Sequence, residues 1–171
     1  VMGTTGCDNT MEELLIGSNT EAVIEEVKCP VLSVPNTATW QGIQKIVYAT
    51  DYAPGDSEAM AKVVALGSLF NANIDVVHVA KEADQDETSK GQILMRELQQ
   101  KYPDVPLRFQ IIVSKHAREG LKEYFVREKG DVLAVLRKEK GFLKNLFSQS
   151  LAEKMTYQAE VPLLVLQGKK V

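Results

Sequence analysis

Short apolar runs alternate with helical segments through most of this 171-residue chain. The runs that we predict as strands are residues 43–50, 74–79, 107–113, 131–135 and 163–166. Apolar periodicity predicts helices over 57–70, 92–102 and 117–129, and a fourth that begins at Ser150. The polar stretch 81–90 is predicted as a loop. This alternation is typical of an α/β fold with a doubly wound, five-stranded parallel sheet that helices cover on both faces.

The common strand order of such a sheet, 3-2-1-4-5, reverses direction between the first and the fourth strand. Ligands bind at that point, beyond the carboxyl ends of the strands. Asp51 ends the first predicted strand, and residues 136–150 form the loop after the fourth. We therefore place the candidate ligand site at this edge. Asp51 also suits a plain turn ahead of Pro54 and Gly55, and this alternative stays open.

Residues 17–34 resemble residues 149–166 without a gap. Each segment has a Ser-x-x-Glu capping box, led by Ser18 or Ser150, and then an apolar helix, a proline-containing loop and an apolar strand. This repeat divides the chain into the C-terminal part of a first unit (1–35), a link (36–42) and a complete second unit (43–171). We expect that the front of the first unit is missing and that the chain is a piece of a tandem protein.

Two glycines three residues apart, Gly3 and Gly6, follow the hydrophobic start, and Gly17 and Ser18 open the first helix. Glycine lets the backbone approach a ligand closely, and the free amides of a helix start attract anions. The pattern predicts a phosphate-binding loop. A tight turn at Gly3 and Gly6, with helix capping alone at Ser18, is the alternative interpretation.

Composition and charge argue against several classes of protein. The net charge of −3 gives no electrostatic basis for binding nucleic acid, and no apolar run is long enough to span a membrane. The two cysteines, Cys7 and Cys29, have no metal-ligand spacing, so we predict no metal site and a reducing, cytoplasmic location. The basic loop 137–147 suits either an acidic partner or packing against the sheet edge, and we favour packing.

These motifs resemble the universal stress protein family over nearly the whole chain. The family signature is Gly-x-x-Gly, nine residues, Gly-Ser or Gly-Thr, a helix and a Cys-Pro-Val-like strand. Residues 1–18 and 29–34 are similar to it, although ten residues separate Gly6 from Gly17. Residues 45–51 are similar to the first family strand, whose terminal Asp, here Asp51, contacts adenine in nucleotide-binding members.

The resemblance implies a Rossmann-like fold of the adenine-nucleotide alpha-hydrolase type, with ATP as the candidate cofactor and the signature glycines and serine holding phosphates and ribose. In the complete unit the three glycine positions hold Leu136, Glu139 and Gln149, ahead of Ser150. Their side chains occupy the space that a phosphate needs, and Glu139 adds a like charge. We therefore expect the complete unit to be degenerate for ATP binding.

The first unit keeps Gly3, Gly6, Gly17 and Ser18 but lacks a strand to carry its adenine-contacting Asp. It would need Asp51 or another chain to complete a pocket.

The apolar strands Val31–Val34 and Leu163–Leu166 occupy equivalent places in the repeat, and we predict that they associate within or between chains. His78 and His116 are interpreted as structural or exposed, and no residue qualifies as catalytic. The leading hypothesis is a non-enzymatic stress-response binding module. The alternatives are a weak ATPase that uses the glycines of the first unit and a dimerisation scaffold.

Overall fold

A computed structural model gives the fold, and it describes residues 1–4, 18–36, 38–39, 41–82, 84–137 and 161–168. The strands are β1 Met2–Thr4, β2 Val31–Pro35, β3 Lys45–Thr50, β4 Asn73–Ala80, β5 Leu107–Val113, β6 Val132–Arg137 and β7 Leu163–Gln167. The helices are α1 Ser18–Glu26, α2 Asp56–Phe70, α3 Gln85–Lys101 and α4 Ala117–Arg127.

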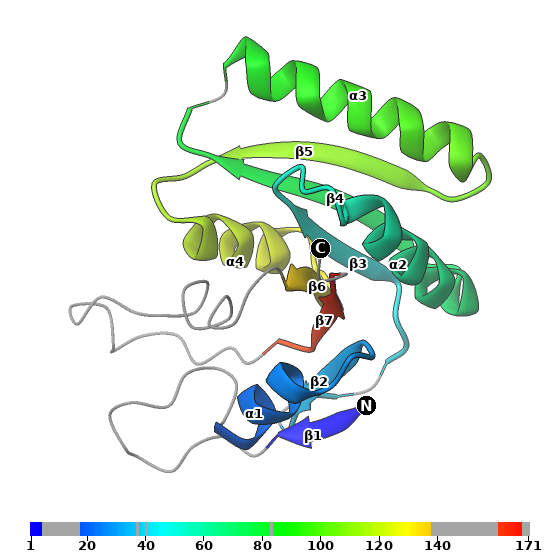
Figure 1. Cartoon of the computed structure of the whole chain (residues 1–171), viewed down its shortest axis with the longest axis vertical. Coiled ribbons are helices and arrows are strands. Elements are labelled where there is room, and N and C mark those ends of the chain that lie inside the picture. The colour runs from blue at the N-terminus through cyan, green and yellow to red at the C-terminus, as the bar shows by residue number, and fades with distance from the viewer. Residues whose placement is uncertain (5–17, 37, 40, 83, 138–160, 169–171) are drawn as a thin grey trace.

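All seven strands form one sheet in the order β1-β2-β7-β6-β3-β4-β5, which Figure 1 shows from bottom to top. Every neighbouring pair is parallel except β2 and β7, which are antiparallel. The five strands β3 to β7 follow the predicted order 3-2-1-4-5 when β3 is counted as the first. The α/β prediction is therefore confirmed, and β1 and β2 extend the expected five-stranded sheet to seven strands.

Helices cover both faces of the sheet and bury two separate apolar cores. Successive residues of a strand point to opposite faces, so Tyr48 packs in the core under α2 and α3, and Val47 packs in the core under α4 and α1. Ile24 from α1 is fully buried against β7. Because both faces are covered, β3 and β6 are apolar along almost their whole length.

Helix α3 begins at Gln85, seven residues earlier than predicted, so the assignment of 81–90 as a loop is wrong. The carboxylate of Asp84 accepts the backbone N–H of Glu87 at 2.9 Å and caps the helix. Lys90 then pairs with Asp86 one turn back, at 2.7 Å. The first turns of α3 are thus held by a cap and by charges, which an apolar periodicity cannot reveal.

The end of α4 also differs from the predicted helix, which extended to residue 129. The helix ends at Arg127, and Lys129 rather than Gly130 takes the left-handed conformation, with φ 55°. A Cβ on Gly130 would lie 2.6 Å from the ring of Phe125 and 3.0 Å from Val47. Glycine is therefore needed at 130 for close packing between α4 and β3.

Candidate functional site

The carboxyl ends of β3 and β6 lie side by side in the middle of the sheet, where the chain winds in opposite directions. Asp51 follows the last residue of β3 directly, and Leu136 and Arg137 close β6. This is the point at which doubly wound sheets bind ligands. Two of the predicted site residues, Asp51 and Leu136, therefore meet at one edge, from strands that lie far apart in the sequence.

Leu136 fills the space between the end of β6 and the start of α2. Its side chain is 6% exposed and belongs to the core under α2. Its Cδ2 atom would be 3.0 Å from a Cβ placed on Gly55, the residue that precedes α2. The leucine thus packs directly against the backbone at the start of α2, and a side chain at 55 would require the leucine to shift.

A buried carboxylate stands beside this contact. Asp56, the first residue of α2, accepts hydrogen bonds from the hydroxyl groups of Tyr48 at 2.6 Å and Thr50 at 2.5 Å, and from the N–H of Ala53 at 2.9 Å. Burial and the adjacent Asp56 carboxylate raise the pKa of Tyr48, which keeps its hydroxyl a donor. The negative charge favoured at a helix start is therefore supplied by the protein itself.

Gly55 and Asp56 were not predicted from the sequence to be part of this edge. A signal for Asp56 exists in the sequence: Tyr48 and Thr50 are two residues apart on one strand, so both hydroxyl groups point to the same face. Buried hydroxyl groups require partners. An acidic residue at the start of the following helix is the nearest candidate.

An aromatic and ionic cluster borders the edge on the β4 side. The ring of Tyr52 lies 4.4 Å from the ring of His78, centroid to centroid. His78 Nδ1 lies 2.9 Å from the carbonyl oxygen of Thr50, and Nε2 lies 3.0 Å from Oε2 of Glu87 in α3. Burial and the charge of Glu87 raise the pKa of Tyr52 to about 12. Both ring nitrogens of His78 have partners, in agreement with its interpretation as a structural residue.

Gly3, the one described glycine of the predicted phosphate-binding loop, lies elsewhere in the sheet. Gly3 is an exposed residue of β1, and Ser18 is the first residue of α1, whereas Gly6, Gly17, Glu139, Gln149 and Ser150 fall outside the described residues. Four strand spacings, roughly 19 Å in all, separate β1 from β3. Because β2 pairs with β7 in antiparallel fashion, β1 also runs in the opposite direction to β3. The structure thus does not bring Gly3 and Asp51 together.

Arg137 links the two parts of the chain, a role that the sequence analysis did not foresee. It was assigned to a basic loop, but it is the last residue of β6. Its guanidinium donates to the carbonyl oxygens of Ile24 at 2.5 Å and Glu25 at 3.1 Å, and Gln167 of β7 donates to Ile24 at 3.0 Å. These donors satisfy the free carbonyl groups at the end of α1.

The residues that the structure describes offer neither a metal site nor a membrane span. Within these, no three His, Cys, Asp or Glu side chains are grouped so that they could hold a metal ion. No helix in the described ranges has the length and apolar character to cross a membrane.

The fold and this edge define a class of proteins: doubly wound α/β proteins with a ligand edge between the first and fourth strands. The model of the universal stress protein family matches residues 1–35 and 42–167. The chain belongs to this family. No match was found among curated proteins.

Solved structures of universal stress proteins share the fold, which is Rossmann-like and of the adenine-nucleotide alpha-hydrolase type. One from Archaeoglobus fulgidus DSM 4304 has a TM-score of 0.67 at 13% identity, over 86% of this chain and 53% of that one. A putative one from Pseudomonas aeruginosa UCBPP-PA14 has a TM-score of 0.60 at 17% identity, over 97% and 62%. A universal stress protein described in complex with cAMP has a TM-score of 0.57 at 14% identity, over 75% and 100%. The chain thus spans less than two thirds of the first two structures.

Proposed function

We propose that this chain is a regulatory or binding module of a tandem universal stress protein, acts in the cytoplasm without catalysing a reaction, and has a complete unit that does not bind ATP tightly. The tandem interpretation is supported by two separate family matches, residues 1–35 and 42–167. The repeat also equates β2 with β7, and these two strands pair antiparallel, as expected of two similar units joined about a local two-fold axis.

One observation carries the proposed loss of ATP binding: the packing of Leu136 on Gly55 at the centre of the ligand edge. A phosphate there would have to displace a buried leucine that is part of the core. It would also lie next to the carboxylate of Asp56, which already accepts three hydrogen bonds from the protein. Like charges in a poorly solvated site repel strongly, so the residues present do not fit a triphosphate.

Isothermal titration calorimetry of the 171-residue protein with Mg-ATP tests the proposal. We expect no saturable heat up to about 1 mM nucleotide, which corresponds to a binding free energy weaker than about −4 kcal/mol. Asp51→Ala should then change nothing. Stoichiometric micromolar binding that is lost in Asp51→Ala and kept in Asp104→Ala, an exposed aspartate in the turn before β5, would overturn the proposal.

A second candidate function, adenine-nucleotide binding, is favoured by the structural neighbour described with cAMP. The single phosphate of cAMP needs less space beside Leu136 than the triphosphate of ATP does. The same titration with cAMP distinguishes the cases: binding that depends on Asp51 places the nucleotide at the central edge. ATP binding with slow hydrolysis that Gly17→Val removes would instead favour the weak ATPase of the first unit.

The third candidate is a dimerisation scaffold that works through the last strands, Val31–Val34 and Leu163–Leu166. In the described sheet β7 lies between β6 and β2, and both of its edges are paired. A dimer at this joint would therefore need the β2 strands of two copies to exchange, as in a domain swap. Dimers that form only after unfolding and refolding at high concentration would favour this candidate.

A further inference from the structure

Strand β5 lies at one end of the sheet, and one of its edges pairs with no other strand among the described residues. Within the described part of the chain it pairs with β4 alone, whereas β7 has a partner on each side. The opposite end of the sheet is β1, which has only three residues, against seven in β5. A long exposed edge presents a row of unpaired N–H and C=O groups that can template another strand.

The usual protection of an edge strand is missing from β5. The strand contains no proline and no lysine, and its one charged residue is Arg108. The guanidinium of Arg108 is engaged within its own chain: it donates to buried Asp75 at 3.1 and 3.0 Å and to Glu128 at 2.7 Å. Its side chain is half-exposed, so this single, paired cation is the only charge that β5 places near the edge.

Side chains on the α3 face of β5 form an apolar row, made of Leu107, Phe109, Ile111 and Val113. Val113, at the end of this row, is 59% exposed although it lies in a strand. In an antiparallel pair, residues directly opposite each other point to the same face. An identical row on a second copy would thus meet this row along its whole length, and apolar cross-strand pairs stabilise such a ladder.

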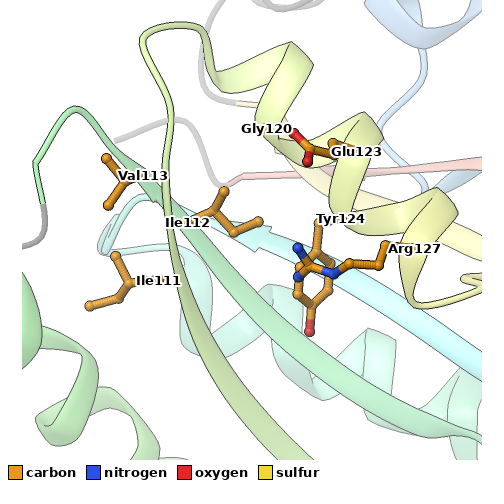
Figure 2. Close-up of a pocket in the computed structure, with 7 residues that line it drawn as sticks. All are labelled: Ile111, Ile112, Val113, Gly120, Glu123, Tyr124 and Arg127. Carbon is orange, nitrogen blue, oxygen red and sulfur yellow. The ribbon is translucent and has the colours of Figure 1, made fainter.

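The other face of β5 carries a groove of about 270 Å³ between the strand and α4 (Figure 2). Ile112 points into it from β5, and Glu123, Tyr124 and Arg127 line it from the helix. The α4 side of the groove thus carries one acidic side chain, Glu123, and one basic side chain, Arg127, one helical turn apart. An interface between identical copies must be self-complementary, and a wall that carries both signs of charge meets that requirement.

We infer that β5 is a docking edge for a second copy of this chain, which adds its own β5 antiparallel. The overlap of the seven-residue strands is greatest when the two-fold axis passes beside Gln110. In that register Phe109 lies opposite Ile111 of the second copy, and Leu107 lies opposite Val113. The two sheets then continue as one, and the apolar rows on the α3 face cover each other.

A cysteine placed on the axis tests the register. In a Cys7→Ser, Cys29→Ser background, Gln110→Cys should form a disulfide-linked dimer under mild oxidation at low micromolar protein. Opposite residues of an antiparallel pair have Cα atoms about 4.5–5.5 Å apart, within the range of a disulfide. The matched control, Gln99→Cys on the exposed surface of α3, should stay monomeric on a non-reducing gel.

A charge at the edge tests the surface without a new crosslink. Val113→Lys should weaken the dimer by about tenfold or more in sedimentation equilibrium, since it enters twice per dimer and replaces an apolar pair. Val126→Lys, at an equally exposed valine (60%) on α4 outside the groove, should leave the dissociation constant unchanged. Circular dichroism checks that both variants remain folded.

Three outcomes would overturn the inference. The first is a protein that stays monomeric at about 100 μM by sedimentation, a concentration at which even weak edge pairing is populated. The second is a dimer that Val113→Lys does not weaken. The third is crosslinking of Gln99→Cys as fast as Gln110→Cys, which marks random collision.

Discussion

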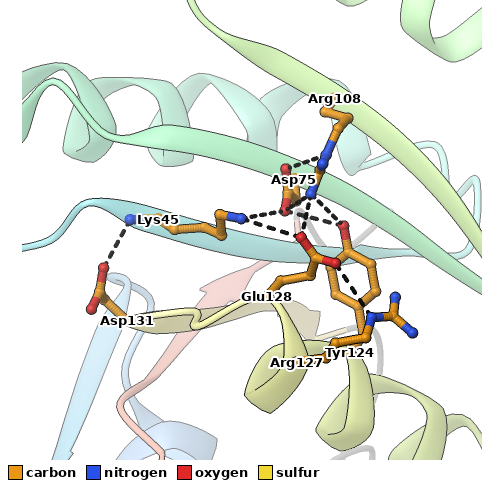
Figure 3. Close-up of polar contacts among 7 residues, drawn as sticks. All are labelled: Lys45, Asp75, Arg108, Tyr124, Arg127, Glu128 and Asp131. Carbon is orange, nitrogen blue, oxygen red and sulfur yellow. Dashed lines mark hydrogen bonds and ion pairs between the residues drawn. The ribbon is translucent and has the colours of Figure 1, made fainter.

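Replacing Arg108 with methionine should destabilise the protein through a buried carboxylate on the neighbouring strand. Asp75 is 2% exposed and accepts two hydrogen bonds from Arg108, at 3.1 and 3.0 Å, and one from the Tyr124 hydroxyl at 3.1 Å (Figure 3). Lys45 adds an ion pair at 3.5 Å. The network joins three strands and α4 at the amino edge of the sheet, and its centre is a charge with little access to water.

The magnitude follows from what remains after the substitution. Removing one partner of a buried ion pair costs about 3–5 kcal/mol, because the other charge stays buried. Here the cost is smaller, about 2–3 kcal/mol, since Lys45 and Tyr124 still face Asp75 and the Arg108 side chain is 49% exposed. The methionine keeps the apolar stem of the arginine, so little packing is lost. For a chain of this size the melting temperature should fall by about 5–10 °C.

Urea unfolding of Arg108→Met, followed by circular dichroism at low protein concentration, measures this loss. Arg127→Met is the matched control, because Arg127 also contacts Glu128, at 3.3 Å, and stacks on the ring of Tyr124 at 5.1 Å. Its side chain is 60% exposed and does not reach Asp75, so it should cost about 0.5 kcal/mol or less. Equal losses in the two variants would refute the reasoning, since burial of the partner carboxylate would then have no effect.

Three further outcomes follow from the contacts of single residues. Asp84→Ala should lower the free energy of unfolding by about 1 kcal/mol through the lost cap of α3, and Asp84→Asn should restore most of it in the same urea titration. Gly91→Ala should cost about 1–2 kcal/mol although alanine favours helices, because its Cβ would overlap the ring of Phe109; an unchanged unfolding midpoint would show that the ring moves freely. The hydrogen bond from Arg108 is the main reason that the pKa of Glu128 lies below its usual value, so Arg108→Met should raise this pKa in an NMR titration. A carboxylate with a lowered pKa stabilises the fold near neutral pH, and this contribution is lost as the pH falls. In Arg108→Met the contribution should be smaller.

The strands could be predicted from the sequence because buried parallel strands are continuous apolar runs separated by helices, and their order is the common one for a doubly wound sheet. Residues 107–113 were predicted as a strand with the bounds that β5 has in the structure. The start of α3 could not be predicted from periodicity, since its first turns contain no apolar face. The Asp84-x-x-Glu87 spacing was the available signal for a helix start, and in the structure the Asp84 carboxylate accepts the backbone N–H of Glu87.

Alignment with the glycine signature predicted that Leu136 occupies the ligand edge, but not what the leucine contacts. Its partner, Gly55, belongs to a different strand-helix connection, and their meeting depends on the pairing of β3 with β6. Such a contact comes from tertiary structure alone. A glycine before a helix is interpreted as a turn residue in any sequence, and only the structure shows that Leu136 packs on it.

The antiparallel joint between β2 and β7 has a consequence for any nucleotide site in this chain. Parallel strands carry their ligand edge at one end, so β3 and β6 present theirs at the same edge of the sheet. Because β2 runs against β7, the first segment presents its carboxyl ends at the opposite edge. A nucleotide held by Gly3 therefore cannot share ligands with Asp51 of the same chain, so Asp51 cannot complete a pocket at Gly3.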